Sequence, residues 1–464
     1  MQRHNNKIPE DMESATTREF WEKSQPLPVW RKICFAIGGA PYQITSTVLG
    51  FFMSIFLLEV AQVDPSHVSV IVFGGKLWYA MTDPVCGYLV NRTKPSSWGK
   101  YKPWILLTMP FACVTYLCFW AVPDYSQQGK LWWYLVFYCL FQGFLSGVHV
   151  PYTSMTMSLS ENQRDRDSIT VYRMVAEAIG VMTGVIIQGH FIKKHRTAGS
   201  CEKGSSSSNQ SSPSGDNIIN QIGSYHDASV TIICIYVICI LICFYGTKEQ
   251  KVNHMAPEDG FFLGLQKVLF FRPYVKLSMS VLFLSVAISI TQGNLALFCT
   301  HTLGMGRHFS TFITIIMVTN SSVYFYMHQP FAVFRSGILC KRGSARRKLL
   351  QLACWSMLPD VIDEFYITHG EHRDAIFYSF YVFFNKLATG FAVASSQFAL
   401  KFGGYRVGVC QQPPSVGRAL RYLMIPGPVV AVVIALVFLA QYPINDTKAR
   451  LNAQKIKEKQ STTF

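Results

Sequence analysis

The chain has 464 residues, of which 50% are hydrophobic, 14% aromatic and only 15% charged. Apolar runs recur along it, each close to the ~20 residues that a helix needs to cross a bilayer. A series of soluble domains is excluded, because soluble proteins do not repeat such runs at this density. We therefore expect an all-α polytopic membrane protein that folds as one helical bundle.

The formal net charge of +16 could suggest a nucleic-acid partner. Lys and Arg, however, concentrate in short connections between the apolar runs, which is the bias of cytoplasmic loops in membrane proteins. We therefore expect membrane lipid rather than nucleic acid as a partner. The 13 cysteines lie mostly in apolar runs and form no CxxC pair, so neither a metal nor a redox cofactor is indicated.

The order of apolar runs predicts two groups of spans. A polar segment at 1–32 precedes a half at 33–246, whose six spans lie at about 34–60, 67–90, 103–122, 131–157, 169–191 and 228–246. A connection at 247–273 leads to a second half at 274–442, with spans at about 274–300, 309–334, 375–402 and 420–442, and to a basic tail at 443–464. Ten spans place both termini on the same, cytoplasmic side of the membrane.

The second span contains a single carboxylate, Asp83, in an apolar run. A charge at membrane depth is costly, so such a residue usually faces the interior of the bundle and marks a transport pathway. Lys386 lies in the apolar middle of the span at 375–402 and could pair with it. The alternative interpretation is a permanent structural ion pair between the two helices.

A cytoplasmic gate is predicted from charges near the inner ends of the spans. Arg173 and Glu177 are four residues apart and share one helical face, so they form either a gate or a structural pair. We include in this gate Lys76 and the charged loop residues Arg166 and Asp167. On the other side of the membrane, the Ser-rich loop at 193–227 carries a glycosylation sequon at Asn209.

The pattern of spans is irregular at 318–353. A cluster of cations belongs on the cytoplasmic side, yet the motif Trp355-Ser356-Met357-Leu358-Pro359-Asp360-Val361 follows without an intervening run of spanning length. This irregularity weakens any expectation of two matched halves.

Six spans, a longer inner connection and further spans resemble the major facilitator superfamily, in which two six-helix halves surround a midplane site. The motifs Thr82-Asp83-Pro84-Val85-Cys86-Gly87 and Trp98-Gly99-Lys100-Tyr101-Lys102-Pro103-Trp104 resemble its glycoside-pentoside-hexuronide:cation symporters. His149-Val150-Pro151-Tyr152 and the Trp355 motif narrow the resemblance to the major facilitator superfamily domain-containing protein 2 type. Against that family, the ninth and most of the tenth helix are missing here, which indicates an alternative splice form or a faulty gene model.

The resemblance implies a lysolipid cargo and two branches, a sodium-dependent lysophosphatidylcholine symporter and a sphingosine 1-phosphate exporter. Phe73-Gly74-Gly75-Lys76 and Gly408-Val409-Cys410-Gln411 look more like the exporter, whereas Gln292-Gly293-Asn294 looks more like the symporter. We favour the exporter branch. The resemblance also implies a plasma-membrane location, a monomer, and a disulfide between Cys201 and Cys410, two free thiols being the alternative.

The family's cation site implies a site here with fewer charges. Its two acids, one helical turn apart, correspond to Tyr79 and Asp83, and its span-four hydroxyl is retained as Ser146. A phenol carries no negative charge at neutral pH, so we expect weak or absent sodium coupling. Lys386 and Gln292, the latter in place of a further acid, are then the residues expected to bind a phosphate-bearing head group.

Three other functions are alternatives to lysolipid transport. A cation-coupled sugar symporter would need an acid at position 79 and a more polar pocket. A membrane enzyme has no nucleophile–base pair or metal-ligand spacing to support it, so we expect no catalytic activity. A non-transporting, truncated isoform is suggested only by the missing spans.

Overall fold

The computed structural model describes residues 27–160, 163–196, 215–249, 270–304, 357–369, 374–407 and 412–444, with isolated positions between these ranges. The helices before residue 250 form the first group: α2 (Val29–Ile37), α3 (Ala40–Ile55), η1 (Phe56–Val60), α4 (Pro65–Arg92), α5 (Lys102–Trp120), α6 (Gln127–Ser158), α7 (Gln163–Arg196) and α8 (Gly215–Gly246). The second group comprises α10 (Arg272–His301), α13 (Leu358–His369), α14 (Asp374–Phe402), α15 (Pro414–Met424) and α16 (Pro426–Ala440).

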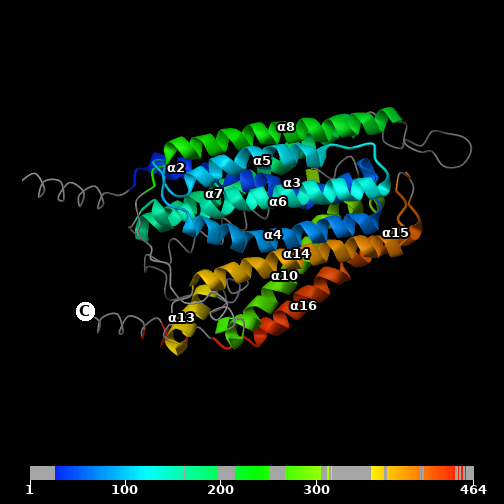
Figure 1. Cartoon of the computed structure of the whole chain (residues 1–464). Helices are drawn as coiled ribbons and strands as arrows, with labels where there is room; N and C mark the ends of the chain where they lie inside the picture. Colours follow the sequence, from blue (N-terminus) through cyan, green and yellow to red (C-terminus); the bar gives the residue numbers. More distant parts are fainter. Residues whose placement is uncertain are drawn as a thin grey trace, which may run out of the picture.

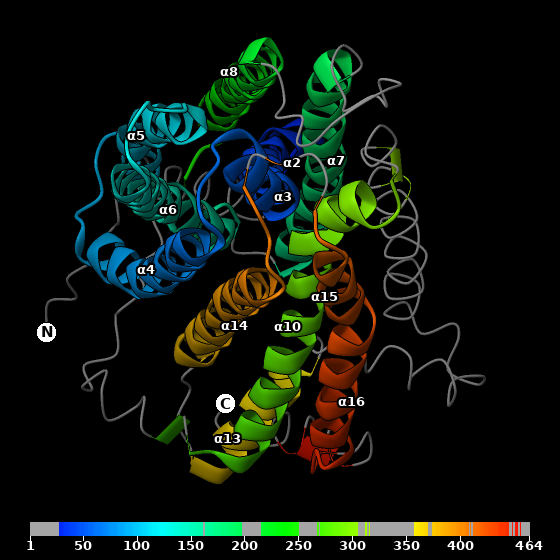
Figure 2. The same cartoon turned by 90° about the vertical axis from the view of Figure 1, so that its right-hand side faces the viewer.

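The two groups lie side by side and meet where α4 packs along α14 (Figure 1). α10 also packs against α3, as the view along the bundle shows (Figure 2). The described helices match every predicted span except the eighth, at 309–334, which falls almost wholly outside the described residues, as does the irregular stretch at 318–353. The expected all-α polytopic architecture is therefore confirmed for the part of the chain that the structure describes.

Seven described helical segments are long and apolar enough to cross a membrane. They are Val29–Val60, Lys102–Trp120, Gln127–Thr156, Ser168–Ile192, Ile219–Gly246, Arg272–His301 and Pro414–Ala440. α4 and α14 are not among them, although they have 28 and 29 residues. These two helices contain Asp83 and Lys386, and packing α4 on α14 buries both charges away from lipid.

Two glycines interrupt the helix of the first span. Gly38 and Gly39 separate α2 from α3, and a Cβ atom on Gly38 would lie 2.7 Å from the Sγ of Cys243. One on Gly39 would lie 2.8 Å from the hydroxyl of Tyr152. The two glycines therefore bend the span and let α6 and α8 approach it, as expected of small residues in membrane helices.

Another glycine brings α4 against α6. A Cβ atom on Gly75 would overlap the ring of Tyr138, which is 1% exposed and cannot turn away. Gly75→Ala is therefore expected to lower the free energy of unfolding by about 1–3 kcal/mol through overpacking. Thermal unfolding of the purified protein in detergent measures this. Gly223→Ala is the matched control, because no atom lies within 4 Å of the added carbon; equal melting temperatures for the two variants would contradict the prediction.

The bundle has two distinct ends. We call "basic end" the one at which α4 ends at Arg92 and α5 begins at Lys102, and "far end" the one at which η1 ends at Val60 and α4 begins at Pro65. At the basic end, the carboxylate of Glu249 accepts the backbone N–H groups of Lys100, Tyr101 and Lys102 at 2.6–3.2 Å, which caps the N-terminus of α5. The ammonium of Lys102 in turn donates to the carbonyls of Phe244 and Thr247, which closes the C-terminus of α8.

The polar contacts between described residues of the two groups lie at Asp83 or nearer to the far end. The Ser69 hydroxyl donates to the Ala394 carbonyl at 2.8 Å, and the Lys401 ammonium donates to the Ser66 hydroxyl at 2.9 Å. Toward the basic end, α10 and α16 slope away from the first group (left in Figure 1). This conformation therefore joins the two groups at the far end.

Candidate functional site

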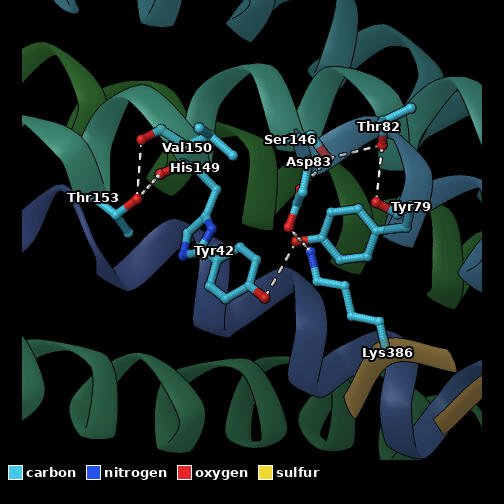
Figure 3. A network of polar contacts seen from close by, with 9 residues as sticks. All are labelled: Tyr42, Tyr79, Thr82, Asp83, Ser146, His149, Val150, Thr153 and Lys386. Carbon is cyan, nitrogen blue, oxygen red and sulfur yellow. Dashed lines mark hydrogen bonds and ion pairs between the residues drawn. The ribbon is translucent and has the colours of Figure 1, made fainter. Parts of the chain in front are cut away.

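Asp83 lies in α4 directly before Pro84 and faces α14. Its Oδ1 accepts a hydrogen bond from the Ser146 hydroxyl of α6 at 2.6 Å, and its Oδ2 is paired with the ammonium of Lys386 from α14 (Figure 3). The Asp83 and Lys386 side chains are 17% and 11% exposed. The ion pair is therefore largely removed from water, and each charge depends on the other for compensation.

The ring of Tyr79, one helical turn before Asp83 in α4, lies against this ion pair. The Lys386 ammonium lies 3.1 Å from the centroid of the Tyr79 ring, a cation–π contact in addition to the ion pair. The Tyr79 hydroxyl donates to that of Tyr42 at 3.3 Å, and the Thr82 and Ser146 hydroxyls are 3.1 Å apart. We refer to Tyr79, Asp83, Ser146 and Lys386 as the Asp83 site.

Tyr42 and His149 extend the network on the first group's side. Their rings are stacked, with centroids 3.8 Å apart and planes at 20° (Figure 3). Thr153, one turn further along α6, donates to the carbonyls of His149 and Val150 at 3.1 and 3.0 Å. This holds the α6 backbone near Pro151, where proline removes an intrahelical hydrogen bond.

The structure places Lys76 near Tyr79 and Gln292 against α3. Lys76 stands about two helical turns from Asp83 along α4, away from the basic end, and its ammonium lies 5.9 Å from the Tyr79 centroid. Gln292 lies against α3, where a Cβ atom on Gly50 would be 2.5 Å from its Nε2. Lys76 therefore lies close to the Asp83 site, and its predicted gate role stays a prediction. The structure gives no contact between Gln292 and Lys386, so the head-group role of Gln292 stays a prediction.

The predicted gate residues are only partly brought together. Arg173 Nε lies 3.3 Å from Glu177 Oε1 within α7, and Arg166 donates to the Ser160 carbonyl at 2.7 Å. The Asp167 side chain lies outside the described residues, as do Cys201, Cys410 and Asn209. Their predicted gate, disulfide and glycosylation roles stay predictions.

Sequence reasoning missed an ion pair beside this gate. Asp165, 4% exposed, accepts from the Lys32 ammonium at 2.8 Å and from the Leu27 backbone N–H at 3.0 Å. Burial raises the pKa of the Asp165 carboxyl, but the hydrogen bonds from Lys32 and Leu27 outweigh it and hold the pKa below its ordinary value. The pair ties α2 to the start of α7.

Because the folded-state pKa of Asp165 is lowered, its contribution to stability is complete above the ordinary Asp pKa and disappears as the pH falls through the lowered value. Asp165→Asn is therefore expected to destabilise the protein by roughly 3 kcal/mol at pH 7. Melting temperatures of wild type and variant in detergent, measured from pH 7 to below pH 4, test this. The difference should shrink in the acid range; a difference that stays constant with pH would contradict the assignment.

A second missed contact joins the two groups at the far end. His301 Nε2, at the end of α10, lies 2.8 Å from Glu59 Oε1 in the π-helical turn η1. π-helical turns occur frequently at functional sites. In the sequence, Glu59 is an acid at the end of an apolar run, and this feature could have indicated the contact.

Sequence matching assigns residues 34–342 and 321–446 to the family described as MFS/sugar transport protein. The sodium-dependent lysophosphatidylcholine symporter 1-A of Danio rerio is 38% identical over 94% of this chain and 89% of its own length. The sphingosine-1-phosphate transporter MFSD2B of Xenopus tropicalis is 34% identical over 94% of this chain and 93% of its own length.

A solved structure of proton dependent oligopeptide transporters shares the fold, with a TM-score of 0.55 at 12% identity, covering 89% of this chain and 98% of that one. The alignment to the Danio rerio relative occupies 486 positions but uses 94% of the 464 residues here, so about 50 of its positions have no counterpart in this chain. The two family matches overlap at 321–342, within the irregular stretch. Both observations agree with an internal segment that the relatives have and this chain lacks.

The family match covers most of the chain, and the relatives exceed 30% identity over nearly their whole length. The chain therefore belongs to the MFS/sugar transport protein family of the major facilitator superfamily, on the branch that contains lysophosphatidylcholine symporters and sphingosine-1-phosphate transporters.

Proposed function

We propose that this chain transports lysolipids across the membrane, with sphingosine 1-phosphate export and weak or no sodium coupling as its activity. The buried ion pair between Asp83 and Lys386 is the main support for this proposal. Of the polar contacts described between the two helix groups, it is the one nearest to the basic end. An anionic head group that binds the Lys386 ammonium would compete with Asp83 for it. Loading would then weaken a contact between the groups, as alternating access requires.

The environment of Asp83 argues against strong sodium binding. Among the nine residues drawn in Figure 3, Asp83 is the only carboxylate. Its two oxygens already bind Ser146 and Lys386, and the Tyr79 hydroxyl one turn away is neutral. Hard cations gain from net negative charge, and the single negative charge of Asp83 is already balanced by Lys386.

We infer the orientation from the distribution of charge, and the location from the glycosylation sequon and the family resemblance. The basic end, with Arg92, Lys100 and Lys102, faces the cytoplasm under the positive-inside rule, as do both termini. In this conformation, the described residues join the two helix groups at the far end and not at the basic end. With the basic end in the cytoplasm, this conformation is the inward-facing one. We propose that the protein acts at the plasma membrane as a monomer.

A sodium-dependent lysophosphatidylcholine symporter is the second candidate. The identity to the Danio rerio symporter, 38%, exceeds the 34% to the Xenopus tropicalis sphingosine-1-phosphate transporter. Overall identity reports common descent, whereas cargo depends on the few residues at the site. A non-transporting isoform is the third candidate, because the chain lacks about 50 positions of its relative.

Release and uptake of labelled sphingosine 1-phosphate and lysophosphatidylcholine by cells that express the chain, with and without sodium, test these candidates. Asp83→Ala is the site variant, and surface staining confirms delivery. Release of sphingosine 1-phosphate that ignores sodium and needs Asp83 supports the exporter. Sodium-driven uptake of lysophosphatidylcholine supports the symporter, and transport of neither lipid by a surface-exposed chain supports the truncated isoform.

A further inference from the structure

The charges around the Asp83 site do not balance. Asp83 is compensated by Lys386, and in α7 Arg173 is compensated by Glu177 at 3.3 Å. Lys76 is a further cation at the same place, since its ammonium and that of Lys386 contact the ring of Tyr79, at 5.9 and 3.1 Å from its centroid. Two ammonium groups thus lie near one aromatic ring, and only that of Lys386 is paired with a carboxylate. Among the described residues of this region, one positive charge is therefore in excess.

The position of Lys76 is fixed by packing. Lys76, Tyr79 and Asp83 lie at positions i, i+3 and i+7 of α4, which places them on one helical face. On α14, Gly390 follows Lys386 by one turn, and a Cβ atom on Gly390 would lie 2.7 Å from the Cβ of Lys76. The absence of a side chain at Gly390 therefore lets the Lys76 stem lie between α4 and α14, one turn of α14 from Lys386.

No hydrogen bond or ion pair joins Lys76 to any residue within the described ranges; its described contact is the Tyr79 ring. A partly buried ammonium with only a cation–π partner is under-compensated, because an isolated charge away from water is costly. This cation is therefore available to an anion that enters between the two groups without displacing Asp83.

We propose that Lys76 is a second head-group cation and makes the site selective for lysolipids that carry a phosphate monoester over those that carry a phosphate diester. A monoester bears a charge of about −1.5 to −2 at pH 7, whereas a diester bears one negative charge. With one amine in the lipid, the monoester leaves a net negative charge that offsets the excess cation. A zwitterionic diester with a choline group is neutral and leaves that cation uncompensated.

This inference rests on the proposed function and adds the residue that selects its substrate. The two ammonium groups hold one phosphate from two sides: Lys386 in competition with Asp83, and Lys76 without an ion pair to give up. Charge-assisted hydrogen bonds to phosphate are stronger than neutral ones and account for the selectivity. An ammonium serves here as a point charge and does not require the fork geometry of arginine.

Equilibrium binding to the purified full chain in lipid nanodiscs tests the proposal, with labelled sphingosine 1-phosphate and lysophosphatidylcholine of equal chain length as probes. Wild type should prefer sphingosine 1-phosphate. Lys76→Gln should weaken its binding roughly 10- to 100-fold and leave lysophosphatidylcholine binding unchanged or improved. Lys76→Arg should retain the preference. Lys248→Gln, which removes an exposed lysine and the same formal charge, should behave as wild type.

A pH series adds a readout that a structural role would not move. Monoester phosphates gain a proton near pH 6, so the wild-type preference should decline between pH 7.5 and 5.5. His149 also lies in the network, and Lys76→Gln retains it. A decline that disappears in Lys76→Gln supports the proposal, and one that persists there assigns the effect to another group and overturns it.

The remaining outcomes are equally decisive. Equal loss of both lipids in Lys76→Gln, or an unchanged preference, overturns the role of Lys76 and leaves lysolipid transport standing. Binding of neither lipid by wild type overturns the proposed function and this inference with it. If Lys76→Gln does not fold, a flat wild-type pH profile or a lost preference in Lys76→Arg overturns the proposal, and the opposite results support it.

Discussion

Lys386→Met is expected to abolish lysolipid transport and to destabilise the folded protein by roughly 3–5 kcal/mol. The substitution removes the ammonium that pairs with Asp83, and a carboxylate 17% exposed then has only the Ser146 hydroxyl as its described partner. Asp83→Asn alone should also abolish transport, because Lys386 retains only its contact with the Tyr79 ring. Transport assays in cells and melting temperatures in detergent measure the two effects separately.

The double variant Asp83→Asn/Lys386→Met separates folding from function. Removing both members of a buried pair costs far less stability than removing one, because no unpaired charge is left behind. We expect a melting temperature near that of wild type and no transport. Double-variant transport comparable to wild type would show that the pair is only structural, which was the alternative interpretation of Asp83 from its sequence.

The pairing of Asp83 with Lys386 could be predicted because the spans at 67–90 and 375–402 each carry a charge in an apolar run, and the charges are opposite. Hydrophobic runs of spanning length similarly fix the number of helices before their packing is known. Tyr79 was also placed correctly beside Asp83, since a spacing of four puts both on one face. These inferences needed only local patterns.

What sequence reasoning could not supply were contacts between distant segments that have no periodic signal. Glu59 and His301 are separated by 242 positions, and Glu249 reaches the start of α5 across 147. The sequence places Lys76 in its helix but does not give its depth relative to α14. That depth depends on Gly390, whose lack of a side chain decides how closely the two helices approach.

Tyr79→Asp is expected to introduce sodium dependence. The variant places a second carboxylate one helical turn from Asp83 on the same face of α4, which adds carboxylate oxygens as ligands for a hard cation and removes the net positive charge that repels it. The excess positive charge from Lys76 is cancelled at the same time, and preference should shift from a phosphate monoester toward a zwitterionic diester. We expect sodium to stimulate lysophosphatidylcholine uptake by at least about fivefold, a coupling of ~1 kcal/mol.

Uptake by cells in sodium buffer and in buffer with an organic cation of equal ionic strength measures this coupling, with Tyr79→Asn as the matched control of similar size without charge. The asparagine variant loses the ring beneath Lys386 but gains no acid, so its uptake should not respond to sodium. If the aspartate variant is equally indifferent to sodium yet melts at a higher temperature than wild type, Lys386 has paired with both carboxylates. Sodium coupling would then require the substrate to displace Lys386 from the carboxylates. The neutral side chain of Tyr79 would in that case not explain why the wild-type protein lacks sodium coupling.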